Sequence, residues 1–443
     1  MPTYIKTGLW DKKPTGYKGE LNLDLLVAQN APSVIGVNGT SLYSTSPLAG
    51  SGNPAGNSII LGLEAGLDST AGNTVFLGAA AGKSATNPEN SIFLGYFSGF
   101  LATDSYNSNF IGQNSGYTAN NAYYSNFIGT SAGQAAYNAY NSNFLGRYAG
   151  SQATNATYSN FLGLFAGYQA TYANFSNFLG QNAGYEASDA SASNFLGQYA
   201  GYSSTNASYS NFLGAYAGLN APNAFNSNFL GSSAGDTATA ANNSNFIGNT
   251  SGQAATNANN SNFLGQNSGR SASQANNSNF LGKESGQNAT NAYNANFFGE
   301  QAGKGATGAN NANFIGKTAG FGASSAIQSN FIGMQAGYGA TDAANSNFIG
   351  LQAGYGATTA SNSNFIGVGA GKNSTGYNVN AFGYNAHVGG SISGQTVFSN
   401  YSLPSYLNRA AAVAAITVPL GAVSNNTYLY YNQTTFAIEA VRL

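Results

Sequence analysis

The stretch SNFIGQNSGYTANNAYY, Ser108–Tyr124, decides the fold because the chain goes on repeating it. The next copies are SNFIGTSAGQAAYNAYN from Ser125 and SNFLGRYAGSQATNATY from Ser142, and this 17-residue unit recurs through the copy that begins at Ser363. Looser copies precede it from Ser58, and a degenerate copy surrounds Phe382, so about 20 units span residues 58–384. Constant spacing over this length implies that neighbouring units stack in register, since one inserted residue would displace every equivalent position.

The composition of the unit predicts an all-β fold. A period of 17 residues is too short for paired helices or for a propeller blade, and two Gly per unit with abundant Asn oppose a long helix. Asn-Phe-Leu/Ile suits a short strand, which the Gly that follows then ends. The sequence therefore predicts a parallel β-solenoid (a β-roll) of about 20 coils, one unit to a coil. At about 4.8 Å per coil, its length is roughly 95 Å.

The strand positions predict three columns of equivalent side chains. Asn at the second place of the unit favours an amide ladder between coils. Phe at the third place and Leu or Ile at the fourth point to opposite faces, because side chains alternate along a strand. One column fills the coil and the other forms an exposed apolar stripe, and the pattern leaves open which is which. The columns include Phe110, Phe127, Phe144, Phe161, Phe178 and Phe195; Ile111, Ile128 and Leu145; and Asn109, Asn126, Asn143 and Asn160.

An apolar stripe of this length predicts self-association. Monomers rarely expose an apolar patch larger than a few hundred Å², and no helical segment in the sequence is long enough to cover this one. We therefore expect a homo-oligomer whose subunits pack along the solenoid axis, and the pattern favours a homotrimer. Tyr gathers at the ends of the units, where sequence variation marks an exposed rim. Tyr123, Tyr124, Tyr140 and Tyr158 are candidates for receptor contact, with mere stacking between coils as the equal alternative.

Both ends of the chain depart from the repeat. Residues 1–57 contain the only Trp, Trp10, and a concentration of charge, and they are expected to cap the solenoid or to attach it to another protein. Residues 385–443 are expected to form a small C-terminal module. In it, PSYLNRAAAVAA (404–415) predicts a short helix, and the segments from Thr427 and Phe436 predict a β-hairpin.

The composition of the 443 residues argues against several functions. Lys and Arg number 13 and Asp and Glu 14, which gives a net charge of −1 and no basic run for nucleic acid. No apolar stretch is long enough to insert in a membrane, and the N-terminus lacks the apolar core of a secretory signal. His387 is the only His, Cys is absent, and the carboxylates form no column. We therefore expect no catalytic site, no metal site, no cofactor and no enzymatic activity.

Two resemblances add to these expectations. The unit SNFLGxxAG resembles the repeats of trimeric autotransporter adhesin heads, which implies a trimerising β-roll, although the repeat here is longer and carries Phe in its strand. The segments around Tyr4–Trp10 and Gly16–Asp24, and the end from Ala410 to Leu443, are similar to parts of tail-fibre and virion proteins of tailed bacteriophages. That resemblance implies a virion protein made in the host cytoplasm and released by lysis.

The leading hypothesis is a trimeric phage fibre for attachment to the host surface. Its partners are other copies of itself, other virion proteins at one terminal region, and a host-surface glycan or protein. The alternative is a self-assembling extracellular filament or matrix protein, in which coils stack end to end. An ice-binding solenoid ranks lower, because the Thr column (Thr154, Thr205, Thr341 and Thr358) is interrupted by Asn, Tyr and Ser. A glycan-degrading spike would need clustered carboxylates, which the sequence lacks.

Overall fold

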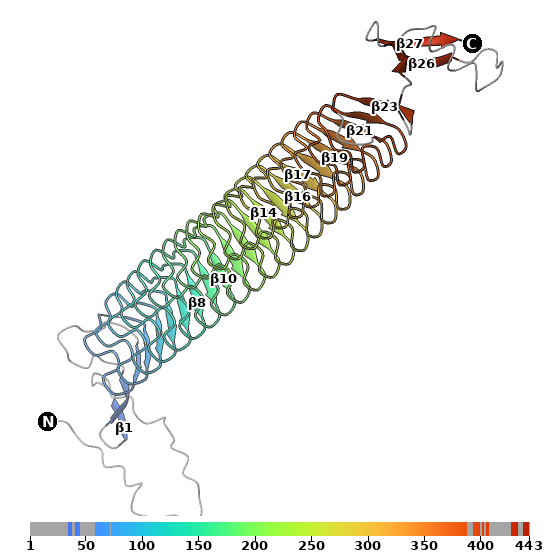
Figure 1. Ribbon diagram of the computed structural model, residues 1–443. Coiled ribbons are helices and arrows are strands. Elements are labelled where there is room, and N and C mark those ends of the chain that lie inside the picture. Colours follow the sequence, from blue (N-terminus) through green and yellow to red (C-terminus); the bar gives the residue numbers. More distant parts are fainter. Residues whose placement is uncertain are drawn as a thin grey trace, which may run out of the picture.

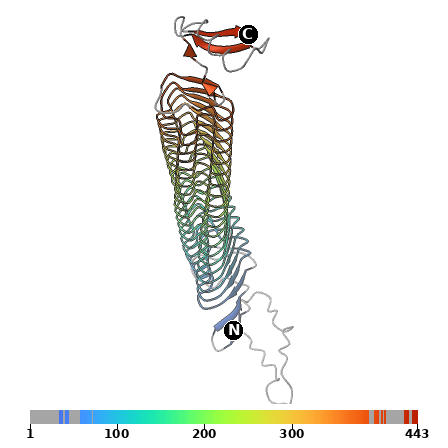
Figure 2. The same cartoon turned by 45° about the vertical axis from the view of Figure 1, so that its right-hand side comes forward.

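The computed structural model of the protein is a straight rod of stacked coils (Figure 1). It describes residues 34–37, 40–44, 58–70, 72–387, 393–398, 401–402, 405–406, 427–432 and 437–442. All of its regular structure in these ranges is β, with no helix. The predicted parallel β-solenoid of about 20 coils is confirmed. In the turned view of Figure 2 the coils keep one outline along the rod.

Each coil contributes one three-residue strand, and the strands lie on one side of the rod. The solenoid strands are β3 (Ile59–Leu61), β4 (Val75–Leu77), β5 (Ile92–Leu94), β6 (Asn109–Ile111), β7 (Asn126–Ile128), β8 (Asn143–Leu145), β9 (Asn160–Leu162), β10 (Asn177–Leu179), β11 (Asn194–Leu196), β12 (Asn211–Leu213), β13 (Asn228–Leu230), β14 (Asn245–Ile247), β15 (Asn262–Leu264), β16 (Asn279–Leu281), β17 (Asn296–Phe298), β18 (Asn313–Ile315), β19 (Asn330–Ile332), β20 (Asn347–Ile349), β21 (Asn364–Ile366), β22 (Asn380–Phe382) and β23 (Thr396–Phe398).

These strands form one parallel ladder in which each residue pairs with its equivalent in the next coil. Asn177 pairs with Asn194, Phe178 with Phe195 and Leu179 with Leu196, and the same register holds throughout. The ladder continues beyond residue 384, because Thr396–Phe398 pairs with β22 at a 16-residue step. Val397 takes the buried place that Phe holds in most other coils. The sequence boundary at 384 missed this coil because Thr-Val-Phe lacks the Asn-Phe-Leu/Ile signature.

The interior of the solenoid is a column of Phe surrounded by small residues. Phe side chains of the strands are fully buried from Phe76 to Phe365. From Phe127 onward their rings stack with centroids 4.6–4.8 Å apart, so the ring spacing equals the coil spacing. Ala119 and Ala122, with their equivalents, are also buried. Small residues are required there because each ring takes most of the space inside a coil.

The rest of each coil is a series of tight turns that bond to both neighbours. In the coil that begins at Ser108, Asn114, Thr118, Asn121 and Tyr124 all have left-handed backbone angles, with φ between 50° and 57°. Each of these residues donates its N–H to the preceding coil, for example Asn114 to the carbonyl of Tyr96 at 2.9 Å. Asn tolerates this conformation better than most residues, which accounts for much of the Asn in the sequence.

The first Gly of each unit is required by the close approach of two coils. Gly180 has φ +136°, and a Cβ built on it would lie 2.5 Å from the carbonyl oxygen of Gly197. The equivalent Gly of the neighbouring coils meets the same obstacle. The second Gly, such as Gly184, leaves room for the ring of Phe178 at 2.2–2.7 Å from the same kind of Cβ. Gly at these two places therefore fixes the distance between coils and the room for the core ring.

The ends of the ladder carry further strands. β1 (Val34–Val37) and β2 (Thr40–Ser44) pair antiparallel, and β2 lies against β3. At the other end β24 (Tyr401–Ser402) pairs antiparallel with β23. β26 (Thr427–Asn432) and β27 (Ala437–Arg442) form an antiparallel pair, as expected for the terminal hairpin. The predicted helix over 404–415 is not confirmed, because Ser405–Tyr406 is strand β25 beside β26. Residues 407–415 lie outside the described residues, as does most of the predicted N-terminal cap.

Substitution of Gly180 by Ala tests the close approach of the coils. We expect a loss of about 3 kcal/mol or more in the free energy of unfolding, because the new Cβ clashes with backbone at a φ that only Gly adopts readily. Urea unfolding followed by circular dichroism measures the effect.

Gly305→Ala is the matched control. Gly305 has φ +66° and nothing within 4 Å of its built Cβ. Only the conformational cost of about 1–2 kcal/mol applies there. Equal losses for the two variants would contradict the account of Gly180.

Candidate functional site

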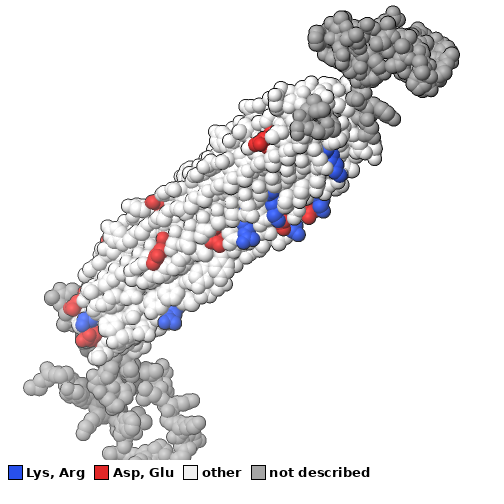
Figure 3. All heavy atoms as spheres, viewed as in Figure 1, with Lys and Arg blue, Asp and Glu red and all other residues white. Residues whose placement is uncertain are grey.

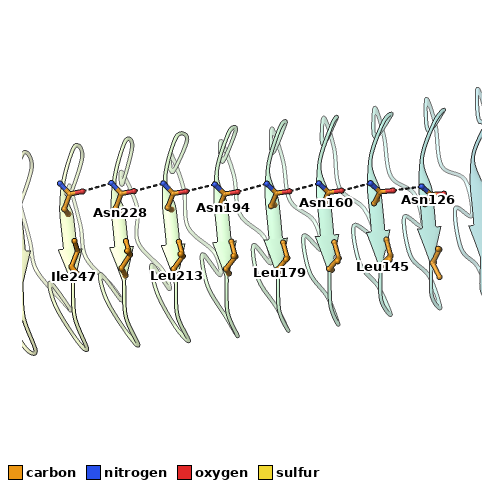
Figure 4. A pocket seen from close by; sticks show the side chains of 16 residues that line it. Asn126, Leu145, Asn160, Leu179, Asn194, Leu213, Asn228 and Ile247 are labelled. Carbon is orange, nitrogen blue, oxygen red and sulfur yellow. Dashed lines mark hydrogen bonds between the residues drawn. The ribbon is translucent and has the colours of Figure 1, made fainter.

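The Asn side chains on the outer side of the strands form an uninterrupted amide ladder. From Asn109 to Asn364, each Asn donates its Nδ2–H to Oδ1 of the Asn in the next coil, at 2.6–2.9 Å, and Asn380 is the last acceptor. Figure 4 shows the part of this row from Asn126 onward, with the bonds between neighbouring Asn as dashed lines. An amide nitrogen has two hydrogens, so each ladder member keeps one N–H that its ladder bond does not use. The ladder is therefore both a brace between coils and a row of polar groups.

The Leu/Ile column lies beside the Asn ladder on the same outer face of the sheet. Side chains such as Leu145, Leu179 and Ile247 project from this face in Figure 4. Most are between 36% and 40% exposed, whereas the Phe between them and the Asn is fully buried. The structure thus resolves the alternative that the sequence left open: Phe fills the coil and Leu/Ile forms the exposed stripe. We call the two outer columns together the Asn–Leu/Ile face.

The Asn–Leu/Ile face is hollowed into a groove. The groove has a volume of about 1000 Å³ between β7 and β14, where its only lining residues are Asn and Leu or Ile. A second hollow of about 400 Å³ continues it from Asn245 to Phe298. One wall is a row of amides and the other a row of aliphatic side chains, repeated at the coil spacing. Such a surface suits a long partner with the same repeat.

The groove has a rigid floor. Beneath it the Phe rings stack, and the Ser that opens each unit is buried and bonded in two directions. Ser176 accepts a hydrogen bond from its successor, the N–H of Ser193, at 3.2 Å, and donates its Oγ–H to the carbonyl of Ala190 at 2.7 Å. Buried hydroxyls paired in this way join neighbouring coils, and their hydrogen bonds offset the cost of removing the hydroxyl from water. The face cannot change its pitch without disrupting these bonds.

The candidate rim Tyr lie together on another side of the coils. Tyr106, Tyr123 and Tyr140 stack with centroids 4.9 Å and 4.8 Å apart. Tyr124 and Tyr158 are about half exposed and meet this stack edge to face. Burial raises the pKa of Tyr123, and the neighbouring Tyr140 and Tyr106 raise it further. Stacking between coils is therefore present, and it leaves receptor contact by the same residues as a proposal.

Charged side chains are sparse on the rod, and several of them lie close together on one edge (Figure 3). Glu284 pairs with Lys304 at 2.7 Å, and Glu300 with Lys317 at 3.0 Å. The hydrogen bond from Lys304, and then that from Gln301, lowers the pKa of Glu284. None of these residues lines the groove, so no charge opposes apolar contact there.

The residues that the structure describes include no candidate metal site. No group of three or more His, Cys, Asp or Glu in those ranges could hold a metal ion. Over the same ranges, no helix has the length and apolar character to cross a membrane. His387 is the last residue of the described range 72–387 and is exposed.

The residues of the site were predicted from the sequence, but their arrangement was not. The structure brings together the Asn column and the Leu/Ile column as the two walls of one groove, which the sequence treated as separate features. The period-2 alternation carried this signal, because the second and fourth places of the unit must share a face. Sequence reasoning also missed a cavity beside Tyr140, whose signal is the end of the run of Tyr at Thr157 in the rim column.

Loss of one ladder amide tests its contribution to stability. Asn245 accepts from Asn228 at 2.8 Å and donates to Asn262 at 2.7 Å. Asn245→Ala removes both bonds, and we expect a loss of about 1–3 kcal/mol in the free energy of unfolding.

Asn249→Ala is a control in the same coil. Asn249 is exposed and its side chain makes no hydrogen bond within residues 72–387. Its replacement should change the free energy of unfolding by about 0.5 kcal/mol or less. Chemical denaturation of both variants gives the comparison, and an unaffected Asn245→Ala variant would show that the ladder does not stabilise the rod.

Comparison with known proteins assigns no role to the Asn–Leu/Ile face. No protein-family model matches the chain, and no curated protein matches it. The Asn–Leu/Ile face and the Tyr rim are therefore the features on which a function has to rest.

Proposed function

We propose that the protein is a structural fibre, a stiff homotrimeric rod of a bacteriophage virion that attaches the particle to the host surface. The observation that carries the proposal is the open Asn–Leu/Ile face along a rod whose pitch is fixed by its core. The virion assignment rests on the resemblance of both chain ends to phage fibre proteins.

A second copy of this chain is the partner that best fits the face. An occupant must offer apolar side chains over many coils at a spacing of about 4.8 Å, because the Leu/Ile rows repeat at that distance. Another copy aligned in the same direction brings the same rows and the same spare amide N–H groups. An exposed row of this length exceeds what monomers leave open. Self-association along the axis covers it.

The narrowness of the face favours three copies. Each strand is three residues long, so the sheet is only about 10 Å wide. Three such faces around a common axis bring every Leu/Ile row against two others, and the arrangement closes by symmetry. Three rods joined side by side form a stiffer shaft than one. A shaft that presents three copies of each rim surface also strengthens weak contacts with a receptor.

The end-to-end filament is the less favoured alternative. Stacking of coils between molecules needs an open strand edge at each end of the ladder. β24 pairs antiparallel with β23 at one end, and β2 lies against β3 at the other. Both edges are therefore at least partly occupied by the chain itself.

Charge placed on the stripe should separate the subunits. Leu179→Glu with Leu196→Glu puts two carboxylates on the apolar wall of adjacent coils, and burying them against other subunits is costly. We expect the double variant to sediment as a 45.2 kDa monomer with an unchanged circular dichroism spectrum.

Gln181→Glu with Gln198→Glu is the matched control. These residues lie two places after the Leu in the same coils, are exposed, and would carry the same pair of charges. This control should keep the mass of the wild-type protein in sedimentation velocity. If both double variants dissociate, or neither does, the Leu/Ile row is not the interface.

Attachment is tested on the particle itself. Antibodies raised against the purified rod, applied to particles released by lysis and viewed by electron microscopy, should label a projecting fibre and should block adsorption to host cells. Recovery of the rod only in a cell-surface fraction, with no labelled particle, would contradict the virion assignment.

A further inference from the structure

The rim contains a cavity of about 420 Å³ where the Tyr stack stops. It is lined by Asn138, Tyr140, Asn155, Thr157, Tyr172 and Asn174, and we call it the Tyr140 pocket. No charged residue lines it. We propose that the Tyr140 pocket binds a neutral pyranose ring of a glycan.

One face of the Tyr140 ring is open. Tyr106 is covered by Tyr123 and Tyr123 by Tyr140, in each case by the residue at the same place in the next coil. The next residue in this column is Thr157, whose short side chain carries no ring and is buried. The level of the stack next to Tyr140 is therefore vacant.

Tyr158 does not fill the vacant level. Its ring lies 5.7 Å from that of Tyr140 at 80°. Tyr124 stands in the same relation to Tyr106, at 5.4 Å and 81°, and there the stacking place on Tyr106 is still taken by Tyr123. Because Tyr158 contacts Tyr140 as Tyr124 contacts Tyr106, it leaves the stacking face of Tyr140 on the side of Thr157 free.

A pair of amide donors lies beside that face of the Tyr140 ring. The rim ladder runs from Asn121 to Asn138 and on to Oδ1 of Asn155, where Tyr172 ends it. Asn174 uses its Oδ1 to accept from the N–H and the Oγ–H of Thr157, at 3.1 Å and 2.9 Å. Neither Asn155 nor Asn174 uses its Nδ2 in a hydrogen bond within residues 72–387. Two NH₂ groups are therefore available at the edge of the vacancy.

A pyranose matches both the open face of Tyr140 and the two amide donors. Its C–H face packs on an aromatic face, and its hydroxyl and ring oxygens accept from amides. The vacant level admits a sugar ring, stacked as the next member of the Tyr column. An acidic sugar would find no cation among the lining residues, so a neutral sugar is favoured. The biological meaning of the pocket rests on the proposed attachment function, with three such pockets in a trimer.

Filling the pocket from the protein side tests the proposal without disrupting the rod. Thr157→Tyr extends the Tyr column into the vacant level and is expected to fold, since Tyr already occupies this place in the three preceding coils. Tyr140→Ala removes the platform instead. Ala344→Tyr is the matched control, because Ala344 holds the same place in a distant coil.

The measurement is saturation-transfer difference NMR on the full chain with neutral methyl pyranosides (glucoside, galactoside, mannoside and N-acetylglucosaminide), with sialic acid as the charged comparison. At least one neutral pyranoside should bind the wild type and the Ala344→Tyr variant, with the strongest transfer to its C–H face. Binding should fall about tenfold or more in Thr157→Tyr and in Tyr140→Ala. Binding of none of the neutral sugars to the wild type, or retention of binding by Thr157→Tyr, would overturn the proposal.

The oligomeric mass of each sample distinguishes failure of the sugar-binding proposal from failure of the trimeric-fibre proposal. Thr157→Tyr should keep the oligomeric mass of the wild type, because the Tyr140 pocket lies off the Asn–Leu/Ile face. A trimer that binds no sugar overturns the pocket and leaves the fibre. A monomer that binds sugar in the expected pattern supports the pocket and removes the trimeric rod.

Discussion

Register between coils is the constraint on which the rest of this structure depends. Every coil bonds through its backbone to the coil before and the coil after, and the Phe rings stack at 4.6–4.8 Å inside them. A ring in the core leaves no room for a Cβ at the second Gly, and the neighbouring backbone leaves none at the first. The same demands recur in each coil, so the sequence has to repeat with constant length. Uniformity of the rod is thus a consequence of its packing.

The outer surface inherits this regularity. Packing in the core fixes the strand register. The outer Asn and Leu/Ile side chains therefore lie in straight rows. Each Asn of the row uses one N–H of its amide in the ladder. The Leu/Ile row is exposed and has no partner within the described residues. A surface with this order is matched by another of the same order, which is why a second copy explains it better than an unrelated partner. The end of the Tyr column at Thr157 departs from this order, and it is where we propose that an individual ligand binds.

Much of the fold could be predicted from the sequence because each repeated position has one physical role. Gly, Phe and Asn at fixed places were sufficient to predict the parallel solenoid and its period, whereas the face that Asn and Leu/Ile share was not recognised. The choice between Phe and Leu/Ile for the interior could not be made, since both are apolar and alternation alone is symmetric. The left-handed conformation at residues such as Tyr124 and Phe175 was also hidden, because bulky residues rarely adopt it and backbone bonding between coils imposes it here. The final coil at Thr396–Phe398 was missed because pairing is kept there although the side-chain signature is lost.

The central claim is that the Asn–Leu/Ile face is covered by other copies of the same chain, and the solution mass of the wild-type protein tests it most directly. Multi-angle light scattering on a size-exclusion column should give three times 45.2 kDa, with no dependence on loading concentration over a tenfold dilution. A stable mass of 45.2 kDa at all concentrations would contradict the account, because the rod would then expose its apolar stripe along its whole length.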